Sequence, residues 1–299
     1  MKYKTLFDPW CCLTDRTKVI IVTDEIQKDI ALSIQKEIGC QCEIISAPIT
    51  TASMEQLKQL GKDDLVIVLF SIAAFMAGAR EFFSPFSKPK DVSAQYIFIR
   101  LDIPQKALIE GLSTPKALVY EKIAEMNRLL TDAVIRVTNP AGTDISFRIL
   151  PFETCSHAVD ETHDYAFLPP SEISAEVLPH TANGKIVIDV TVGQLYHFGK
   201  LLGQFGCVSS PVILIVENGM ITDIIGDAMA AELKEKLFAL HPDCRKLVEL
   251  GQGLSKMSPV GITGVDESII DTCHFGFGDG GNCGVHLDVI VSCPTIQNE

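Results

Sequence analysis

A histidine and a carboxylate stand two residues apart near the C-terminus, at His286 and Asp288 in the segment VHLDVIV. In a β-strand, residues two apart point to the same face, so these side chains would project together while Leu287 and Val289 point into a core. An imidazole beside a carboxylate on an otherwise apolar strand is a common beginning of a divalent-metal site. A structural, hydrogen-bonded histidine is the alternative that the pair alone leaves open.

A second histidine, His274, lies in the segment CHFGFG. In a strand it shares a face with Gly276 and Gly278, which leave the space above them empty, while the two phenylalanines point the other way. We expect this run to form an antiparallel hairpin with the run of His286, with His274 opposite Asp288. This register places three polar groups on one face, and a shift by one residue would separate them.

Three glutamates are further candidates. Glu249, in ELGQGL, is expected near the end of a short helix that begins at Pro242 and stops before Gly251. A carboxylate is electrostatically disfavoured at that end of a helix, which is compatible with an inward-facing ligand. Glu172 and Glu176 follow two prolines in FLPPSEISAEVLP, where an extended, turning chain would bring a loop carboxylate over the site. Simple exposure to solvent is the alternative for all three.

The other motifs in the sequence are weaker indications of function. FGDGG lacks the strand-to-helix context of a phosphate loop, and no G-x-S-x-G elbow is present. His157 and His163 lie six residues apart in a segment with three acidic residues and are interpreted as parts of a polar loop, and Asp144 as a turn residue. The ten cysteines contain no C-x-x-C, so we interpret them as reduced and mostly buried thiols. Cys273 is of interest because it precedes His274.

The elements that must position these residues follow two patterns. From Lys18 to about residue 132, short apolar runs alternate with helical periodicity. Strands are expected at 19–22, 43–46, 65–70 and 96–101, and isoleucines at every fourth position from Ile26 to Ile38 predict a helix. A further helix is expected from Thr114 to about Leu130. Such alternation predicts parallel strands with helices on the sheet faces.

From Ala133 onward the pattern changes to hairpins. AVIRVTNPAGTDISFRIL is two alternating runs around a Pro-Ala-Gly turn, and two later segments, ANGKIVIDV and VILIVENGMITDIIG, carry the turn-forming Asn-Gly pair. One helix, at about 228–240, interrupts this region. The sequence therefore predicts an α/β protein, with an N-terminal parallel α/β domain over residues 1–132 and a β-rich (α+β) metal-binding domain over 133–299.

Composition narrows the function classes. A formal net charge of −13 disfavours nucleic acid and anionic membranes as partners, since both attract positive surfaces. The N-terminus MKYKTLFDPWCC does not resemble a secretory signal, and the apolar run from Leu65 is too short to span a bilayer. We expect a cytoplasmic protein that acts on a small molecule or short peptide and forms a homo-oligomer, a dimer or higher.

A series of segments resembles the aminopeptidase T family of metallopeptidases. In order along the chain, they are VIRVTNPAGTDISF, ANGKIVID, IVENGMITDIIG, ELGQGL, TGVDESIIDTCHFGFGD and VHLDVIV. The resemblance covers roughly the C-terminal half. It implies an N-terminal α/β domain, a β-rich domain with a two-metal centre, and zinc, cobalt or manganese as the cation.

Matched residue by residue, the resemblance implies a ligand set consisting of Glu172, Glu249, His274, His286 and Asp288. Glu249 would lie near both metals, and Glu176 is the candidate base. The family carries a tyrosine a few residues beyond the first histidine, where this chain has Gly281.

A related branch contains 2,5-dihydroxypyridine dioxygenases, in which a His, His, Asp triad holds a single iron. That branch has a histidine where this chain has Glu249. Our first hypothesis is therefore a metal-dependent aminopeptidase or small-amide hydrolase, because a site rich in glutamate suits hard Lewis-acid metals. The alternatives are an Fe(II)-dependent ring-cleaving dioxygenase and a relative without catalytic activity.

Overall fold

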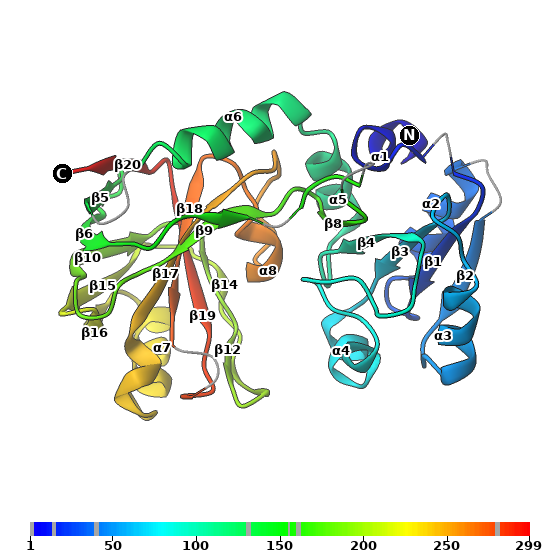
Figure 1. Ribbon diagram of the computed structural model, residues 1–299. Helices are drawn as coiled ribbons and strands as arrows, with labels where there is room; N and C mark the ends of the chain where they lie inside the picture. Colours follow the sequence, from blue (N-terminus) through cyan, green and yellow to red (C-terminus); the bar gives the residue numbers. More distant parts are fainter. Residues whose placement is uncertain are drawn as a thin grey trace. The chain divides into compact units, whose positions relative to one another are not determined.

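The chain forms two compact units, shown in the computed structural model of Figure 1. Unit 1 comprises Met1–Lys116 and Cys155–Ser171, and unit 2 comprises Ala117–Thr154 and Glu172–Glu299. The chain thus passes between the units three times. The change of sequence pattern had suggested a single boundary, between residues 132 and 133. The reason is that a late strand, β8 (Tyr165–Leu168), pairs with the sheet of unit 1. The structure describes residues 3–13, 16–38, 42–129, 133–154, 156–159, 163–278 and 282–299.

Unit 1 is built on a five-stranded parallel sheet with the strand order β2-β1-β3-β4-β8. The strands are β1 (Val19–Thr23), β2 (Cys42–Ser46), β3 (Leu65–Leu69), β4 (Gln95–Ile99) and β8. Every residue of β1 and of β3 is buried, which explains their continuous apolar sequences, since helices cover both faces of such a sheet. The expected parallel α/β architecture is confirmed.

The helices of unit 1 precede or connect these strands. They are α1 (Tyr3–Cys11), α2 (Lys28–Ile38), α3 (Thr51–Lys58), α4 (Ile72–Met76), the 3-10 helix η2 (Ala79–Glu81) and α5 (Gln105–Leu112). The expected isoleucine stripe is only partly correct: Ile34 and Ile38 are buried in α2, but Ile26 is exposed ahead of it. Asp24 turns the chain there, since its Oδ1 accepts hydrogen bonds from the backbone of Ile26 and Gln27.

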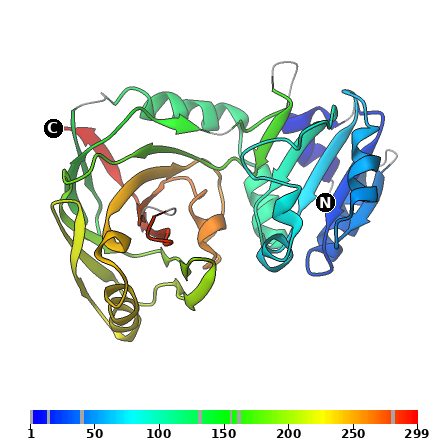
Figure 2. The same cartoon turned by 60° about the horizontal axis from the view of Figure 1, so that its bottom comes forward.

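Unit 2 contains two larger sheets whose strands pair in antiparallel fashion. The six-stranded sheet has the order β16-β15-β10-β6-β5-β20, the seven-stranded sheet the order β14-β11-β19-β18-β17-β9-β7, and β12 and β13 form a separate hairpin. The sheets curve around a shared interior (Figure 2). Phe147 and Phe275, one from each sheet, meet edge to face with ring centroids 6.3 Å apart. The change from parallel to antiparallel pairing along the chain is confirmed.

The elements of unit 2 have the following bounds. The six-stranded sheet contains β5 (Val134–Thr138), β6 (Asp144–Arg148), β10 (Asn183–Ile188), β15 (Val212–Glu217), β16 (Met220–Ile225) and β20 (Thr295–Asn298). The seven-stranded sheet contains β7 (Glu153–Thr154), β9 (Glu172–Glu176), β11 (Thr191–Val192), β14 (Gly206–Cys207), β17 (Leu247–Gly253), β18 (Thr272–Phe277) and β19 (Leu287–Ser292). The remaining elements are α6 (Lys116–Met126), β12 (Leu195–His197), β13 (Lys200–Gly203), α7 (Ala228–Phe238), η3 (Pro242–Arg245) and α8 (Thr263–Asp266).

The two Asn-Gly pairs have different roles. Asn218 and Gly219, with φ of 50° and 78°, form the tight turn between β15 and β16, as the sequence predicts. Asn183 and Gly184 instead begin β10. There a Cβ on Gly184 would lie 2.3 Å from the carbonyl oxygen of Asp144, so glycine permits close strand approach. Among the described residues, no helix is long and apolar enough to cross a membrane.

Candidate metal centre

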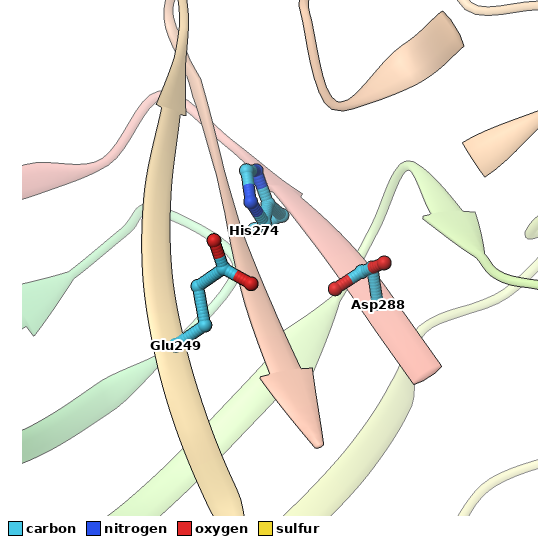
Figure 3. A group of neighbouring side chains, drawn as sticks. All are labelled: Glu249, His274 and Asp288. Atoms are coloured by element: carbon cyan, nitrogen blue, oxygen red, sulfur yellow. The ribbon is translucent and has the colours of Figure 1, made fainter. Parts of the chain in front are cut away.

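Three neighbouring strands, β17, β18 and β19, present polar side chains on one face (Figure 3). Glu249 pairs across the sheet with Gly276, which in turn pairs with Asp288, and Gly251 pairs with His274. Residues directly opposite one another share a face, so both carboxylates and the imidazole project together. The intervening residues lie in the core: Leu250, Phe275 and Val289.

The register of the β18–β19 hairpin differs from the expected one. His274 pairs with Ile290, and Asp288 with Gly276, which is a displacement of two residues. The phenylalanines of β18 pair with a buried leucine and valine of β19 on the core face, and this packing holds the register. Because side chains alternate with a period of two, the displacement leaves His274 and Asp288 on the same face, as diagonal neighbours.

Glu249 lies in a strand, and its expected place in a helix is wrong. Only Pro242–Arg245 form a short 3-10 helix, and β17 begins at Leu247. The pairing of β17 with β18 shifts between Leu247 and Glu249, where one extra residue forms a bulge. A bulge re-aims the side chains that follow it, and here it aligns Glu249 with the face that carries the histidine.

Short contacts connect the five predicted ligands. His286 Nε2 lies 3.1 Å from Asp288 Oδ1 and 3.4 Å from Glu249 Oε2. His274 Nε2 lies 3.4 Å from Glu172 Oε2. Glu249, His274 and Asp288 each offer one ligand atom within 4.8 Å of the other two. The structure therefore brings all five side chains into one cluster within unit 2.

Glu172 reaches this cluster from strand β9, which runs beside β17. It pairs with Gly253, and its backbone carbonyl accepts a hydrogen bond of 2.8 Å from Thr154 Oγ1. The segment was expected as a loop over the site, but it is part of the sheet. The prolines that suggested a turning chain end just before β9 begins.

Two glycines make room for the cluster. A Cβ on Gly251 would lie 2.1 Å from Cε1 and 2.3 Å from Nε2 of His274, so the imidazole occupies the space of a missing side chain. A Cβ on Gly276 would lie 2.9 Å from Glu249 Cβ and 3.1 Å from Asp288 Oδ1. The role of Gly276 follows from strand alternation, whereas that of Gly251 depends on pairing between strands and was not predicted.

The charged groups of the cluster shift one another's pKa values. The charge of Asp288, with hydrogen bonds to Asp288 and Glu249, raises the pKa of His286 to about 11. Burial opposes ionisation of Glu249, but a hydrogen bond from His286 and the nearby imidazoles outweigh it and lower its pKa to about 2. Burial also opposes protonation of His274, yet the carboxylates of Glu172, Glu249 and Asp288 raise its pKa. The face therefore attracts positive charge.

This donor set fits a divalent cation. His274 is 2% exposed, and no described residue forms a hydrogen bond with its Nδ1. A buried polar atom without a partner is costly, and a bound cation with its water would remove that cost. Imidazoles and carboxylates together are ligands for zinc, manganese, cobalt or iron.

A cavity of about 340 Å³ adjoins the cluster, with Glu249 in its wall. Ser174 and Glu176 also line it, because both lie on the same face of β9. Glu176 pairs directly with Glu249 and its side chain is exposed. Ser174 forms a side-chain hydrogen bond with Glu249 that helps to lower the pKa of that carboxyl. The alternation of Glu172, Ser174 and Glu176 is the signal that identifies Ser174.

The other candidate residues lie elsewhere. His157 is buried in unit 1, where burial and the charge of Arg100 lower its pKa to about 4. Asp144 is a strand residue that forms a two-bond ion pair with Arg136. Cys273 is buried, and burial raises the pKa of its thiol. Gly281, which stands where the aminopeptidases have a tyrosine, lies outside the described residues.

The fold and the clustered histidines and carboxylates define a metalloenzyme-like protein. A family model described as NicX, 2,5-dihydroxypyridine 5,6-dioxygenase, matches residues 29–259, well over half of the 299-residue chain. The chain therefore belongs to this family of enzymes. The matched segment contains Glu172, Glu176 and Glu249, and it ends before His274. No curated protein matches the chain.

Two solved structures share the fold. One is a 2,5-dihydroxypyridine dioxygenase from Pseudomonas putida KT2440, with a TM-score of 0.61, 16% identity, and coverage of 99% of this chain and 93% of that chain. The other is wild-type AmpT from Thermus thermophilus, with a TM-score of 0.54, 13% identity, and coverage of 94% and 89%. The family assignment supports the branch that the sequence analysis treated as the alternative. The resemblance to the aminopeptidase is one of fold.

Proposed function

We propose that this protein is a metal-dependent hydrolase of small amides or short peptides, in which Glu172, Glu249, His274, His286 and Asp288 hold one or two divalent cations. The observation that carries the proposal is the position of Glu249 between two imidazoles. Its carboxylate lies 3.4 Å from His286 Nε2, and it lies within 4.8 Å of a ligand atom of His274. A carboxylate in this place can serve two cations at once.

The composition of the ligand set supports hydrolysis. Three carboxylates and two imidazoles supply enough negative charge for a hard Lewis acid or for a pair of them. When bound, such a cation polarises the scissile carbonyl and lowers the pKa of a bound water. Zinc, cobalt and manganese are the cations that we assign to the hydrolase.

The chain's own groups would handle the substrate and the proton. Glu176 is exposed to the cavity beside Glu249 and, outside the proposed ligand set, is the nearest carboxylate in register. We assign to it the role of general base, which accepts a proton from the attacking water and returns it to the leaving amine. Ser174 donates to the Glu249 carboxylate and so keeps that side chain oriented toward the histidines.

The family assignment favours a second candidate, an Fe(II)-dependent ring-cleaving dioxygenase. His274, His286 and Asp288 would supply the two imidazoles and one carboxylate of a facial triad, the arrangement that suits iron in oxygenases. This chain differs from the dioxygenase branch at Glu249, the position at which the resemblance leads us to expect a histidine.

One set of measurements tests both candidates. The purified protein is analysed for bound metals, then assayed for hydrolysis of leucine amide and for oxygen uptake with 2,5-dihydroxypyridine after reconstitution with zinc, cobalt, manganese or Fe(II). We expect amide hydrolysis that depends on zinc, cobalt or manganese and is lost in Glu249→Gln. Iron-dependent oxygen uptake without hydrolysis of any amide would replace the first candidate with the second. Retention of either activity after chelation would contradict both.

A further inference from the structure

Unit 2 contains a second cavity, of about 330 Å³, on the opposite side of strand β17 from the metal cluster. Gln252 contributes to its wall, whereas the neighbouring Gly251 faces His274. Adjacent residues of a strand point to opposite faces, so the sheet separates this cavity from the cluster. Its size lies at the lower end of the range for small-molecule sites.

The cavity is formed by several elements that are far apart in the sequence. Helix α6 contributes Lys122 and Glu125, and Leu129 follows it. Cys293 follows β19, and Ile296 belongs to β20. Met126 and Pro294 complete an apolar part of the wall. A pocket with an apolar body and a few convergent polar groups is the usual form of a ligand site.

Gln252 is the largely buried polar side chain in this wall. It is only 6% exposed, and among the described residues none is seen to form a hydrogen bond with its side-chain amide, which borders the cavity. A primary amide offers two donors and an acceptor in one plane. A ligand with a donor beside an acceptor, as at the edge of another amide, would match this arrangement.

The charged part of the wall argues for a neutral ligand. The Lys122 ammonium lies 3.2 Å from a Glu125 oxygen and 3.6 Å from an Asp271 oxygen. The two carboxylates outnumber the one ammonium, so the wall disfavours an anionic ligand. Both carboxylates are already paired with the lysine, so the wall offers no unpaired charge to a cationic ligand.

We propose that this cavity is a second ligand site, for a small neutral molecule that combines an amide edge with an apolar body. The amide edge pairs with Gln252, and the apolar body packs against Leu129 and Ile296. The site is separate from the metal cluster and its occupation does not depend on the proposed hydrolase activity.

Benzamide is a suitable probe, and Cys293 is a reporter within the wall. The full-length protein is treated with iodoacetamide at increasing benzamide concentration, and alkylation of each cysteine is followed by mass spectrometry. We expect benzamide to slow alkylation of Cys293 but not of Cys207, an exposed cysteine outside the cavity. N,N-dimethylbenzamide, which lacks the donor, should require at least about tenfold higher concentration for equal protection.

Two variants from different strands test the position of the site. Gln252→Leu removes the amide at similar volume, and Ile296→Trp fills the cavity from β20; both should abolish protection of Cys293. Glu249→Gln should retain it, because the metal cluster is not involved. A circular dichroism melt verifies that each variant is folded. Absence of protection by benzamide, equal protection by both compounds, or protection that persists in Gln252→Leu would overturn the proposal.

Discussion

The imidazole of His274 lies directly over Gly251, at 2.1 Å from Cε1 to the position that a Cβ on this glycine would take. The two residues face each other across neighbouring strands, β17 and β18. Alanine is the smallest change that would fill this space, and real side chains do not approach a Cβ so closely. The glycine therefore determines where the most buried histidine of the cluster lies.

Gly251→Ala should displace the His274 ring and reduce metal affinity by at least about tenfold, since the ring must rotate away from its neighbours. Calorimetric titration of the metal-free protein with zinc measures this. Gly264→Ala is the matched control, because a Cβ at Gly264 meets nothing within 4 Å. Equal zinc affinity in the two variants would contradict the assigned role of Gly251.

Glu249→Gln should weaken metal binding by at least about 100-fold, because it removes a charged ligand rather than a supporting contact. The free energy of unfolding of the metal-free protein should fall by up to about 3 kcal/mol, because the interactions with His286 and His274 that lower the pKa of Glu249 are lost. Zinc titration and urea unfolding measure the two effects. Glu217→Gln, at an exposed strand end, is the control for the loss of one charge. A large loss of stability without a loss of affinity would indicate a structural role.

Glu249→His should raise the iron content of the protein relative to zinc, because a third imidazole brings the site closer to the histidine-rich sets that hold Fe(II). Elemental analysis after reconstitution in an equimolar mixture of both metals measures the ratio. Glu217→His, which adds a histidine away from the cluster, should leave the ratio unchanged. An unchanged ratio in Glu249→His would mean that this position does not select the metal.

Unit 1 should lose stability as pH falls from about 6.5 to about 4. His157 is neutral in the folded chain because burial and Arg100 lower its pKa to about 4, whereas the unfolded chain takes up the proton near pH 6.5. Its contribution is present above pH 6.5 and is lost as pH falls through this interval, by up to about 3 kcal/mol. Trp10 is buried in unit 1, and its backbone carbonyl accepts a hydrogen bond from Val159, so its fluorescence reports this unfolding.

His157→Gln should reduce the acid sensitivity of the Trp10 transition, since glutamine does not titrate. His163→Gln, at an exposed position of the same segment, should behave as the unmodified protein does. The same pH dependence in His157→Gln and in the unmodified protein would assign the acid sensitivity to other groups.

The sequence by itself determined which side chains share one face of a strand. Residues two apart in a strand point the same way whatever the strand pairs with, so the common face of His286 and Asp288 was predictable from local spacing. The same local rules predicted the parallel sheet from apolar runs and the β15–β16 hairpin from Asn218 and Gly219. Even the wrong register of His274 left its face intact, because the error was a shift of two.

Only the tertiary structure decided which strands pair and which residues lie opposite these side chains. The strand that carries Glu249 has a charged residue and two glycines, a composition that local propensity does not assign to a strand, and its pairing with β9 and β18 overrides that propensity. The return of β8 to unit 1 depends on contacts between residues more than sixty positions apart. Likewise, Gly251 matters because His274 lies across from it, and Gln252 because a helix, a loop and a strand enclose it. Pairing and enclosure are set by the burial of the whole core, which no short stretch of sequence contains.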